Sequence, residues 1–98
     1  MYIIRCTDGS LYTGITTDMP RRVTQHYRGQ GAKYFRKTKP AQVIYMENNL
    51  IRATASQREY QIKQLSRQQK LQLINTDENQ ISQYCNILEK TLNQLNAP

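Results

Sequence analysis

The chain has 98 residues, and its 14 Lys and Arg side chains against 7 Asp and Glu give a net charge of +7. A chain of this length has room for one hydrophobic core, so we expect a single main domain. The apolar run near the start, at residues 2–4, is too short for a signal peptide or a membrane span. Two cysteines, Cys6 and Cys85, in a chain without such segments predict free thiols and a cytoplasmic protein that does not enter a membrane.

The positive charge is concentrated in the first three quarters of the chain. Residues 1–76 hold 13 basic and 4 acidic side chains, whereas residues 77–98 hold 1 basic and 3 acidic ones. Between Asp18 and Glu47 there are seven basic residues and no acidic one, with aromatic residues interleaved. This pattern is typical of a surface that binds phosphates and stacks on bases; a solvated basic face that only confers solubility is the simpler alternative.

The first predicted element is a β-hairpin. Short runs of β-branched and aromatic residues indicate its two strands, at residues 2–6 and 11–15. A three-residue loop at 7–9, with Gly9 in the left-handed conformation, would place Tyr2 opposite Gly14 and put Tyr2 and Tyr12 on one face. A two-residue loop would instead send the two phenols to opposite faces.

Helices and a third strand are predicted after the hairpin. Thr17 or Asp18 can cap a helix that begins near Met19 and ends at Arg28, before two glycines. A short second helix, a third strand, a third helix and a further helical turn or two capped by Ser66 follow, at residues 31–37, 42–47, 52–65 and 66–73.

The C-terminal segment differs in composition from the rest and forms a separate predicted unit. Its apolar residues are spaced alternately four and three positions apart, which predicts one amphipathic helix with a heptad-like apolar seam. The seam is formed by Ile81, Cys85, Leu88, Leu92 and Leu95. We therefore divide the chain into a domain at 1–75 and a helical extension at 76–98. The extension is expected to pack back onto the domain, with a weak homodimer as the alternative, because so short a seam seldom sustains a free coiled coil.

Five side chains have the chemistry needed to cut a phosphodiester bond, which requires an activated water, a counter-charge and help for the departing oxygen. Glu59 can hold one Mg²⁺ or Mn²⁺ ion, and Arg22 offers a planar guanidinium to a phosphate. Tyr2 and Tyr12 can orient or deprotonate water once nearby positive charge from Arg22 and the metal lowers their pKa. His26, one helical turn after Arg22, can relay that proton.

Each of these residues also has an ordinary structural explanation. A tyrosine in a strand usually packs, His26 can be a packed helix histidine with a backbone partner, and Glu59 can pair with Lys63 one turn later. The combination, and not any single residue, indicates a site.

This combination resembles the GIY-YIG nuclease family. Tyr12-Thr13-Gly14 is similar to the second motif of the family, and Tyr2-Ile3-Ile4, ten residues earlier, is similar to the first. The family's arginine, histidine and glutamate positions fall on Arg22, His26 and Glu59. The resemblance covers residues 1–75 and is greatest to the small stand-alone bacterial members, through residues 5–14, 31–34 and 58–63.

The resemblance implies an α+β fold of β-β-α-α-β-α order, in which a three-stranded antiparallel sheet is flanked by helices, with the C-terminal helix added. It also implies one divalent ion on Glu59 and catalytic roles for the tyrosines, Arg22 and His26, in a family that cuts or processes DNA; which tyrosine is the base stays open. We expect a magnesium-dependent endonuclease that serves DNA repair or processing, with RNA still open as a ligand. The residues expected to hold the nucleic acid are Arg21, Lys33, Tyr34, Arg36 and Lys37.

Three departures from the family pattern shape these expectations. Met1 stands where the first motif has a glycine, the late asparagine of the family has no match better than Asn75, and no second domain supplies sequence specificity. We therefore expect weak or structure-selective cutting. The alternatives are a catalytically weak or inactive nucleic-acid-binding module of the same fold, and an interaction protein whose acidic C-terminal helix recruits a partner.

Overall fold

The computed structural model describes residues 1–30, 32–48 and 51–81, so the predicted C-terminal helix lies outside the described residues except at its start. The elements are β1 (Tyr2–Cys6), β2 (Leu11–Gly14), α1 (Met19–Tyr27), the 3₁₀ helix η1 (Lys33–Arg36), β3 (Pro40–Met46), α2 (Arg52–Lys63) and α3 (Arg67–Leu73). The predicted order is confirmed, and the short second helix is the 3₁₀ turn η1. Among the described residues, no helix is both long and apolar enough to span a bilayer.

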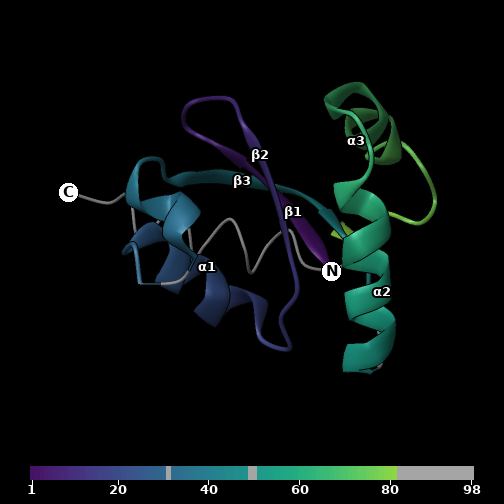
Figure 1. Cartoon of the computed structure of the whole chain (residues 1–98), viewed down its shortest axis with the longest axis horizontal. Helices are drawn as coiled ribbons and strands as arrows, with labels where there is room; N and C mark the ends of the chain where they lie inside the picture. Colours follow the sequence, from purple (N-terminus) through teal and green to yellow (C-terminus); the bar gives the residue numbers. More distant parts are fainter. Residues whose placement is uncertain (31, 49–50, 82–98) are drawn as a thin grey trace.

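The three strands form one antiparallel sheet in the order β2-β1-β3. Helices cover both of its faces, with α1 and η1 on one side and α2 and α3 on the other (Figure 1). Alternate residues of β1 supply the two halves of the core: Tyr2 and Ile4 pack with α1 and η1, whereas Ile3 packs with Ile62 of α2. The predicted α+β fold is thus confirmed.

The hairpin has the predicted three-residue loop. Tyr2 pairs with Gly14, and Cys6 N donates a hydrogen bond of 2.9 Å to the carbonyl of Ser10. Gly9 has a φ of +86°, which is the left-handed conformation that the loop was expected to need. Because the register is now fixed, Tyr2 and Tyr12 lie on the same face of the sheet, toward α1.

Helix α1 is fixed at its start by Asp18, whose side chain accepts a hydrogen bond of 3.2 Å from the backbone N–H of Arg21. Met19, Val23 and His26 are its buried residues, so the helix turns the face that carries His26 toward the sheet. It ends before Gly29, which has a φ of +72°.

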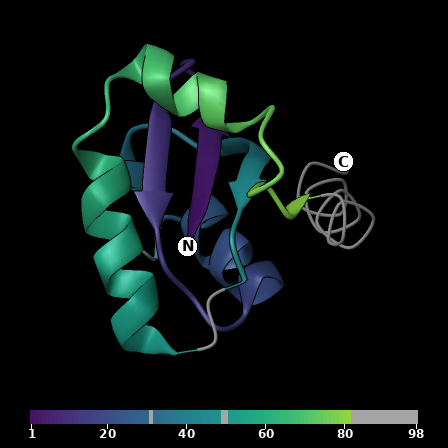
Figure 2. The same cartoon turned by 90° about the vertical axis from the view of Figure 1, so that its right-hand side faces the viewer.

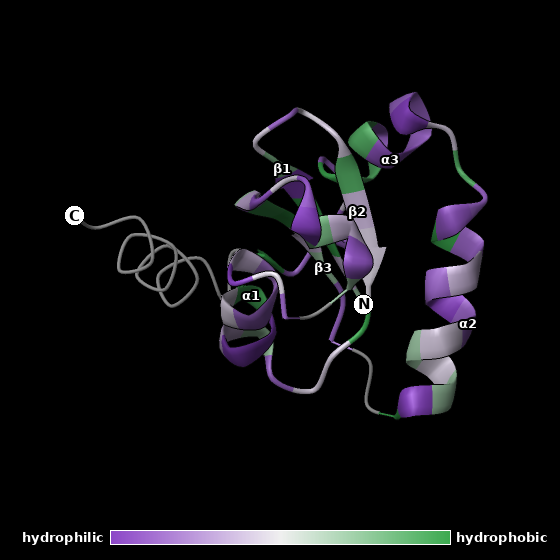
Figure 3. Ribbon diagram, turned by 60° about the vertical axis from the view of Figure 1, so that its left-hand side comes forward, coloured by the Kyte–Doolittle hydropathy of each residue, from purple (hydrophilic) through white to green (hydrophobic). Residues whose placement is uncertain are grey.

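Helix α2 has a narrow apolar anchor. Of its residues, Ala55 and Ile62 are buried, and Ile51 at its N-cap makes no side-chain capping bond. Figure 3 shows α2 mostly in hydrophilic and neutral colours. Figure 2 shows that it runs alongside β2, at one edge of the sheet. Helix α3, by contrast, starts with a complete capping box formed by Ser66 and Gln69.

The outer edge of β3 is covered by the chain that follows α3, a contact that sequence analysis did not predict. Asn79 Nδ2 donates to the carbonyls of Ile44 and Ile74, both at 3.0 Å, and Asn79 Oδ1 accepts from the N–H of Met46 at 3.2 Å. Asn75, the residue considered for the late asparagine of the family, is exposed. Asn79 therefore occupies hydrogen-bonding groups that an edge strand would otherwise leave open.

Candidate active site

Gly14 makes room for the first phenol of the site. Tyr2 is 1% exposed, and a Cβ added to Gly14 would lie 2.5 Å from Tyr2 Oη and 2.7 Å from its Cζ. The ring centroids of Tyr2 and Tyr12 are 6.2 Å apart. The expected juxtaposition of the two phenols is thus present in the structure, and it depends on the absence of a side chain at position 14.

His26 is buried and holds the Tyr2 hydroxyl. Its Nε2 lies 2.7 Å from Tyr2 Oη, and its ring contacts those of Tyr12 and Phe35, with centroid distances of 5.2 and 4.2 Å. Its Nδ1 is buried and has no hydrogen-bond partner among the described residues. A buried N–H without an acceptor is rarer than an unpaired acceptor. We therefore infer that Nε2 carries the proton and donates a hydrogen bond to Tyr2 Oη. The partner of His26 is a phenol and not the backbone group of the simpler explanation.

Arg22 lies on α1, four residues before His26. Its Nη1 donates to Gln25 Oε1 at 3.2 Å, while its Nε is buried without a partner among the described residues. Arg22 and Tyr2 both line a cavity of about 600 Å³, to which Arg21 and Glu47 also contribute. A half-buried guanidinium with spare donors beside a cavity is suited to bind an anion.

Burial controls the protonation of the site. It raises the pKa of Tyr2 and of Tyr12 above the ordinary value of a phenol, and the nearby charge of Arg22 opposes this rise without cancelling it. Burial and the charge of Arg22 lower the pKa of His26 to about 4. Both phenols are therefore protonated and the imidazole is neutral near pH 7, so the charge of Arg22 without a metal ion does not bring a phenol to phenolate.

Glu59 lies on α2 and, like Tyr12 and Arg22, is partly buried. Its side chain is 25% exposed, and its Oε1 lies 3.6 Å from Lys63 Nζ, so the simple ion pair is present. Its charge nevertheless raises the pKa of both Tyr2 and Tyr12, so it lies within electrostatic reach of the phenols. Glu59 does not line the cavity beside Arg22.

The donor set fits a lightly coordinated hard cation. Within the part of the chain that the structure describes, no group of three His, Cys, Asp or Glu side chains gathers as a metal cluster. A partly exposed carboxylate such as Glu59 suits Mg²⁺, which keeps several of its waters and is often bound through one or two carboxylates.

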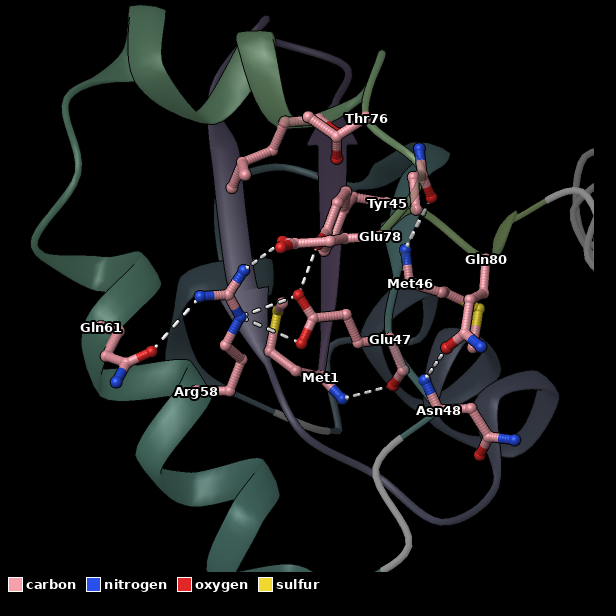
Figure 4. A network of polar contacts seen from close by, with 12 residues as sticks. Met1, Tyr45, Met46, Glu47, Asn48, Arg58, Gln61, Thr76, Glu78 and Gln80 are labelled. Carbon is pink, nitrogen blue, oxygen red and sulfur yellow. Dashed lines mark hydrogen bonds and ion pairs between the residues drawn. The ribbon is translucent and has the colours of Figure 1, made fainter.

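A second carboxylate, Glu47, was missed by sequence analysis. Its two oxygens accept hydrogen bonds of 3.0 and 2.8 Å from Arg58 Nε, and one of them also accepts from the hydroxyl of Tyr45 (Figure 4). Because both oxygens are occupied, Glu47 is a poor ligand for a metal although it lines the cavity. Arg58 lies on α2 and Glu47 directly follows β3, 11 residues earlier, and no local sequence pattern reveals their contact.

The residues expected to hold nucleic acid are mostly exposed. Tyr34 is half-exposed, and its ring centroid lies 5.4 Å from that of Tyr12, which links η1 directly to the site. The cations of this set form no ion pair within the described residues and remain available to a polyanion; they are Arg21, Lys33, Arg36 and Lys37.

Comparisons with known proteins show the family to which the chain belongs. The family model described as the GIY-YIG catalytic domain matches residues 1–72. The UPF0213 protein SSP2268 of Staphylococcus saprophyticus is 48% identical over 75 residues, which are 76% of this chain and 92% of that protein. A UPF0213 protein of Staphylococcus aureus is 49% identical over 74 residues, which are 76% of this chain and 90% of that protein. The solution NMR structure of the UPF0213 protein BH0048 from Bacillus halodurans is 34% identical, with a TM-score of 0.50 over 99% of this chain and 95% of that one. The chain therefore belongs to the GIY-YIG family and is similar to small UPF0213 proteins.

Proposed function

We propose that this protein is a metal-dependent nuclease that hydrolyses phosphodiester bonds of DNA in repair or processing. Membership of the GIY-YIG family supports the nuclease class. The observation that carries the proposal is that Tyr12 and His26 contact or lie near Tyr2, which lines one cavity together with Arg22, while the charge of Glu59 acts on both phenols.

Arg22 would bind the phosphate to be cut. Its guanidinium stays charged at any working pH, and its planar donors match two oxygens of a phosphate. The developing negative charge of the pentacoordinate phosphate would then form next to a fixed positive charge. The unpartnered Nε supports this role, because a buried donor without an acceptor is otherwise unfavourable.

The phenols and the histidine would handle the water. Tyr12 is only partly buried, so solvent can reach it, whereas Tyr2 is held from behind by the Nε2–H of His26. Each hydroxyl can orient the attacking water, and a phenol becomes a base only after its own proton has left. The hydrogen bond from His26 favours the phenolate form of Tyr2, which lowers the barrier to that loss.

Glu59 would hold one Mg²⁺ or Mn²⁺ ion. When bound, such an ion polarises the phosphate and adds the positive charge that a buried phenol needs to ionise near neutral pH. Lys63 must release the Glu59 carboxylate, or share it, for this to happen.

The exposed cations would bind the backbone of the nucleic acid. Lys33, Arg36 and Lys37 lie on or next to η1, and Tyr34 offers a ring beside Tyr12 for stacking on a base. Phosphate contacts do not distinguish DNA from RNA. We propose DNA as the substrate because the family usually acts on DNA, and RNA is tested in the same assays. The cytoplasmic location and the weak homodimer stay predictions.

A nucleic-acid-binding module without catalysis is the second candidate. The observations that favour it are the raised pKa of both phenols and the ion pair that already occupies Glu59. Under this alternative, the basic surface binds nucleic acid and no bond is cut.

One set of assays separates the two candidates. The purified protein is incubated with supercoiled, branched and single-stranded DNA, and with RNA, in Mg²⁺ and in Mn²⁺. Glu59→Ala and Arg22→Ala are compared with matched controls at exposed positions, Asp77→Ala and Arg28→Ala. Cutting that is lost in Glu59→Ala while binding persists, and is kept in both controls, supports the nuclease. Binding with equal traces of cutting in every variant supports the binding module.

A further inference from the structure

The guanidinium of Arg58 joins three separate parts of the fold. Besides its two contacts with Glu47 at the end of β3, its Nη2 lies 2.8 Å from Glu78 Oε2, beyond α3, and its Nη1 donates to Gln61 Oε1 at 3.3 Å. Figure 4 shows these partners converging on one side chain. Arg58 is 26% exposed and Glu47 13%, so the pair is largely shielded from solvent.

Apart from the contacts of Arg58, few interactions fix the orientation of helix α2 about its own axis. Its apolar anchor consists of Ala55 and Ile62, and its N-cap residue makes no side-chain hydrogen bond. A helix with two buried side chains can roll on the sheet at small loss of apolar contact. The polar tether at Arg58 is directional, since it requires the guanidinium to face β3.

Arg58 and Glu59 are successive residues of this helix, so their side chains leave the axis about 100° apart. When Arg58 faces β3, Glu59 is directed to the other side of the buried stripe formed by Ala55 and Ile62. The direction of the Glu59 carboxylate is thus coupled to the contact between Arg58 and Glu47.

We propose that Arg58, held by Glu47, is the positioning residue that aims Glu59 into the active site. The inference rests on the proposed function, in which Glu59 binds a metal ion. Neither Arg58 nor Glu47 is proposed to contact that ion. Glu78 is the exposed partner of the network and contributes less, because exposed ion pairs are weak.

The first test is Mn²⁺ binding without DNA, followed by electron paramagnetic resonance, in variants whose folding is checked by circular dichroism. Arg58→Met and Glu47→Gln should each weaken Mn²⁺ binding about tenfold or more, as loss of an orienting partner typically does. Glu59→Gln should abolish it, and the control Glu78→Gln should change it less than about threefold. If Glu47 were itself the ligand, Arg58→Met would strengthen binding, and the proposal would be overturned.

The second test needs neither metal nor cutting, so it separates failure of this proposal from failure of the proposed function. The pKa of Tyr12 is followed by NMR of ¹³C-labelled tyrosine in a double-mutant cycle. Glu59→Gln should lower that pKa in the wild-type background and leave it unchanged in the Arg58→Met background, because Glu59 no longer faces the ring there. An equal drop in both backgrounds would show that Glu59 keeps its position without Arg58 and would overturn the proposal. If Mn²⁺ does not bind to the wild type, the proposed function fails while this cycle still decides the positioning.

Discussion

Replacing Gly14 by alanine should displace Tyr2 and break its contact with His26. The added methyl carbon would meet Tyr2 Oη at 2.5 Å and Cζ at 2.7 Å, which is closer than non-bonded atoms tolerate. Tyr2 is 1% exposed, so its ring can yield only by displacing packed neighbours or by shifting toward the cavity that it lines. Overpacking typically costs about 1–3 kcal/mol, and loss of one buried hydrogen bond adds about 1 kcal/mol. We therefore expect the free energy of unfolding to fall by about 2–4 kcal/mol.

Urea unfolding of Gly14→Ala measures this loss, and the cutting assay reports its effect on the site. Gly9→Ala is the matched control: its φ of +86° strains an alanine by about 1–2 kcal/mol, but no atom lies within 4 Å of the added carbon. The control should therefore keep wild-type cutting. Tyr2→Phe combined with Gly14→Ala should cost less than the sum of the single changes, because the bond to His26 is lost only once. A loss below about 0.5 kcal/mol in Gly14→Ala, with cutting intact, would refute the close packing of Tyr2 on Gly14.

Three further predictions address other parts of the fold. The pKa of His26 is about 4 in the folded protein against 6.5 ordinarily, so its contribution to stability is complete above about pH 6.5 and is lost as the pH falls toward 4. Urea unfolding between pH 4 and 7 should show about 2–3 kcal/mol of pH dependence in the wild type that His26→Gln lacks, and equal slopes would contradict the neutral imidazole. Asn79→Ala should lower the free energy of unfolding by about 2–4 kcal/mol, whereas Asn75→Ala should change it by less than about 0.5 kcal/mol; similar losses would mean that Asn79 does not hold the edge of β3. Removing both Arg36 and Lys37 should reduce the slope of log affinity for DNA against log salt by about 2, and an unchanged slope in a filter-binding titration would exclude contacts to phosphate there.

The parts of the fold that could be predicted from sequence are those that depend on local rules. The pairing of Tyr2 with Gly14 follows from strand parity and a three-residue loop, because cross-strand partners share a face. The start of α1 follows from the two possible capping residues before Met19, Thr17 and Asp18, of which Asp18 caps the helix. These local features were sufficient to put Tyr2 and Tyr12 on one face of the sheet and Arg22 and His26 on one helix, whereas the contact of His26 with Tyr2 depends on tertiary packing.

The contacts that sequence analysis missed connect residues far apart in the chain. Glu47 directly follows β3 whereas Arg58 lies on α2, and Asn79 contacts β3 from beyond α3. Such pairs have no periodic signature, so a single sequence does not reveal them. The size of the pKa shift of the phenols could not be predicted either, because burial opposes the charge of Arg22 and only the packed structure shows how deeply Tyr2 lies.

The measurement that tests the central claim most directly is the single-turnover rate of DNA cutting by Glu59→Gln in Mg²⁺ or Mn²⁺, with DNA affinity determined in parallel. Glu59→Gln removes the carboxylate charge while keeping the size of the side chain. If the five residues act as one hydrolytic site, the rate should fall by about 100-fold or more, while the affinity for DNA stays at the wild-type value. A Glu59→Gln protein that cuts DNA at the wild-type rate would contradict the account.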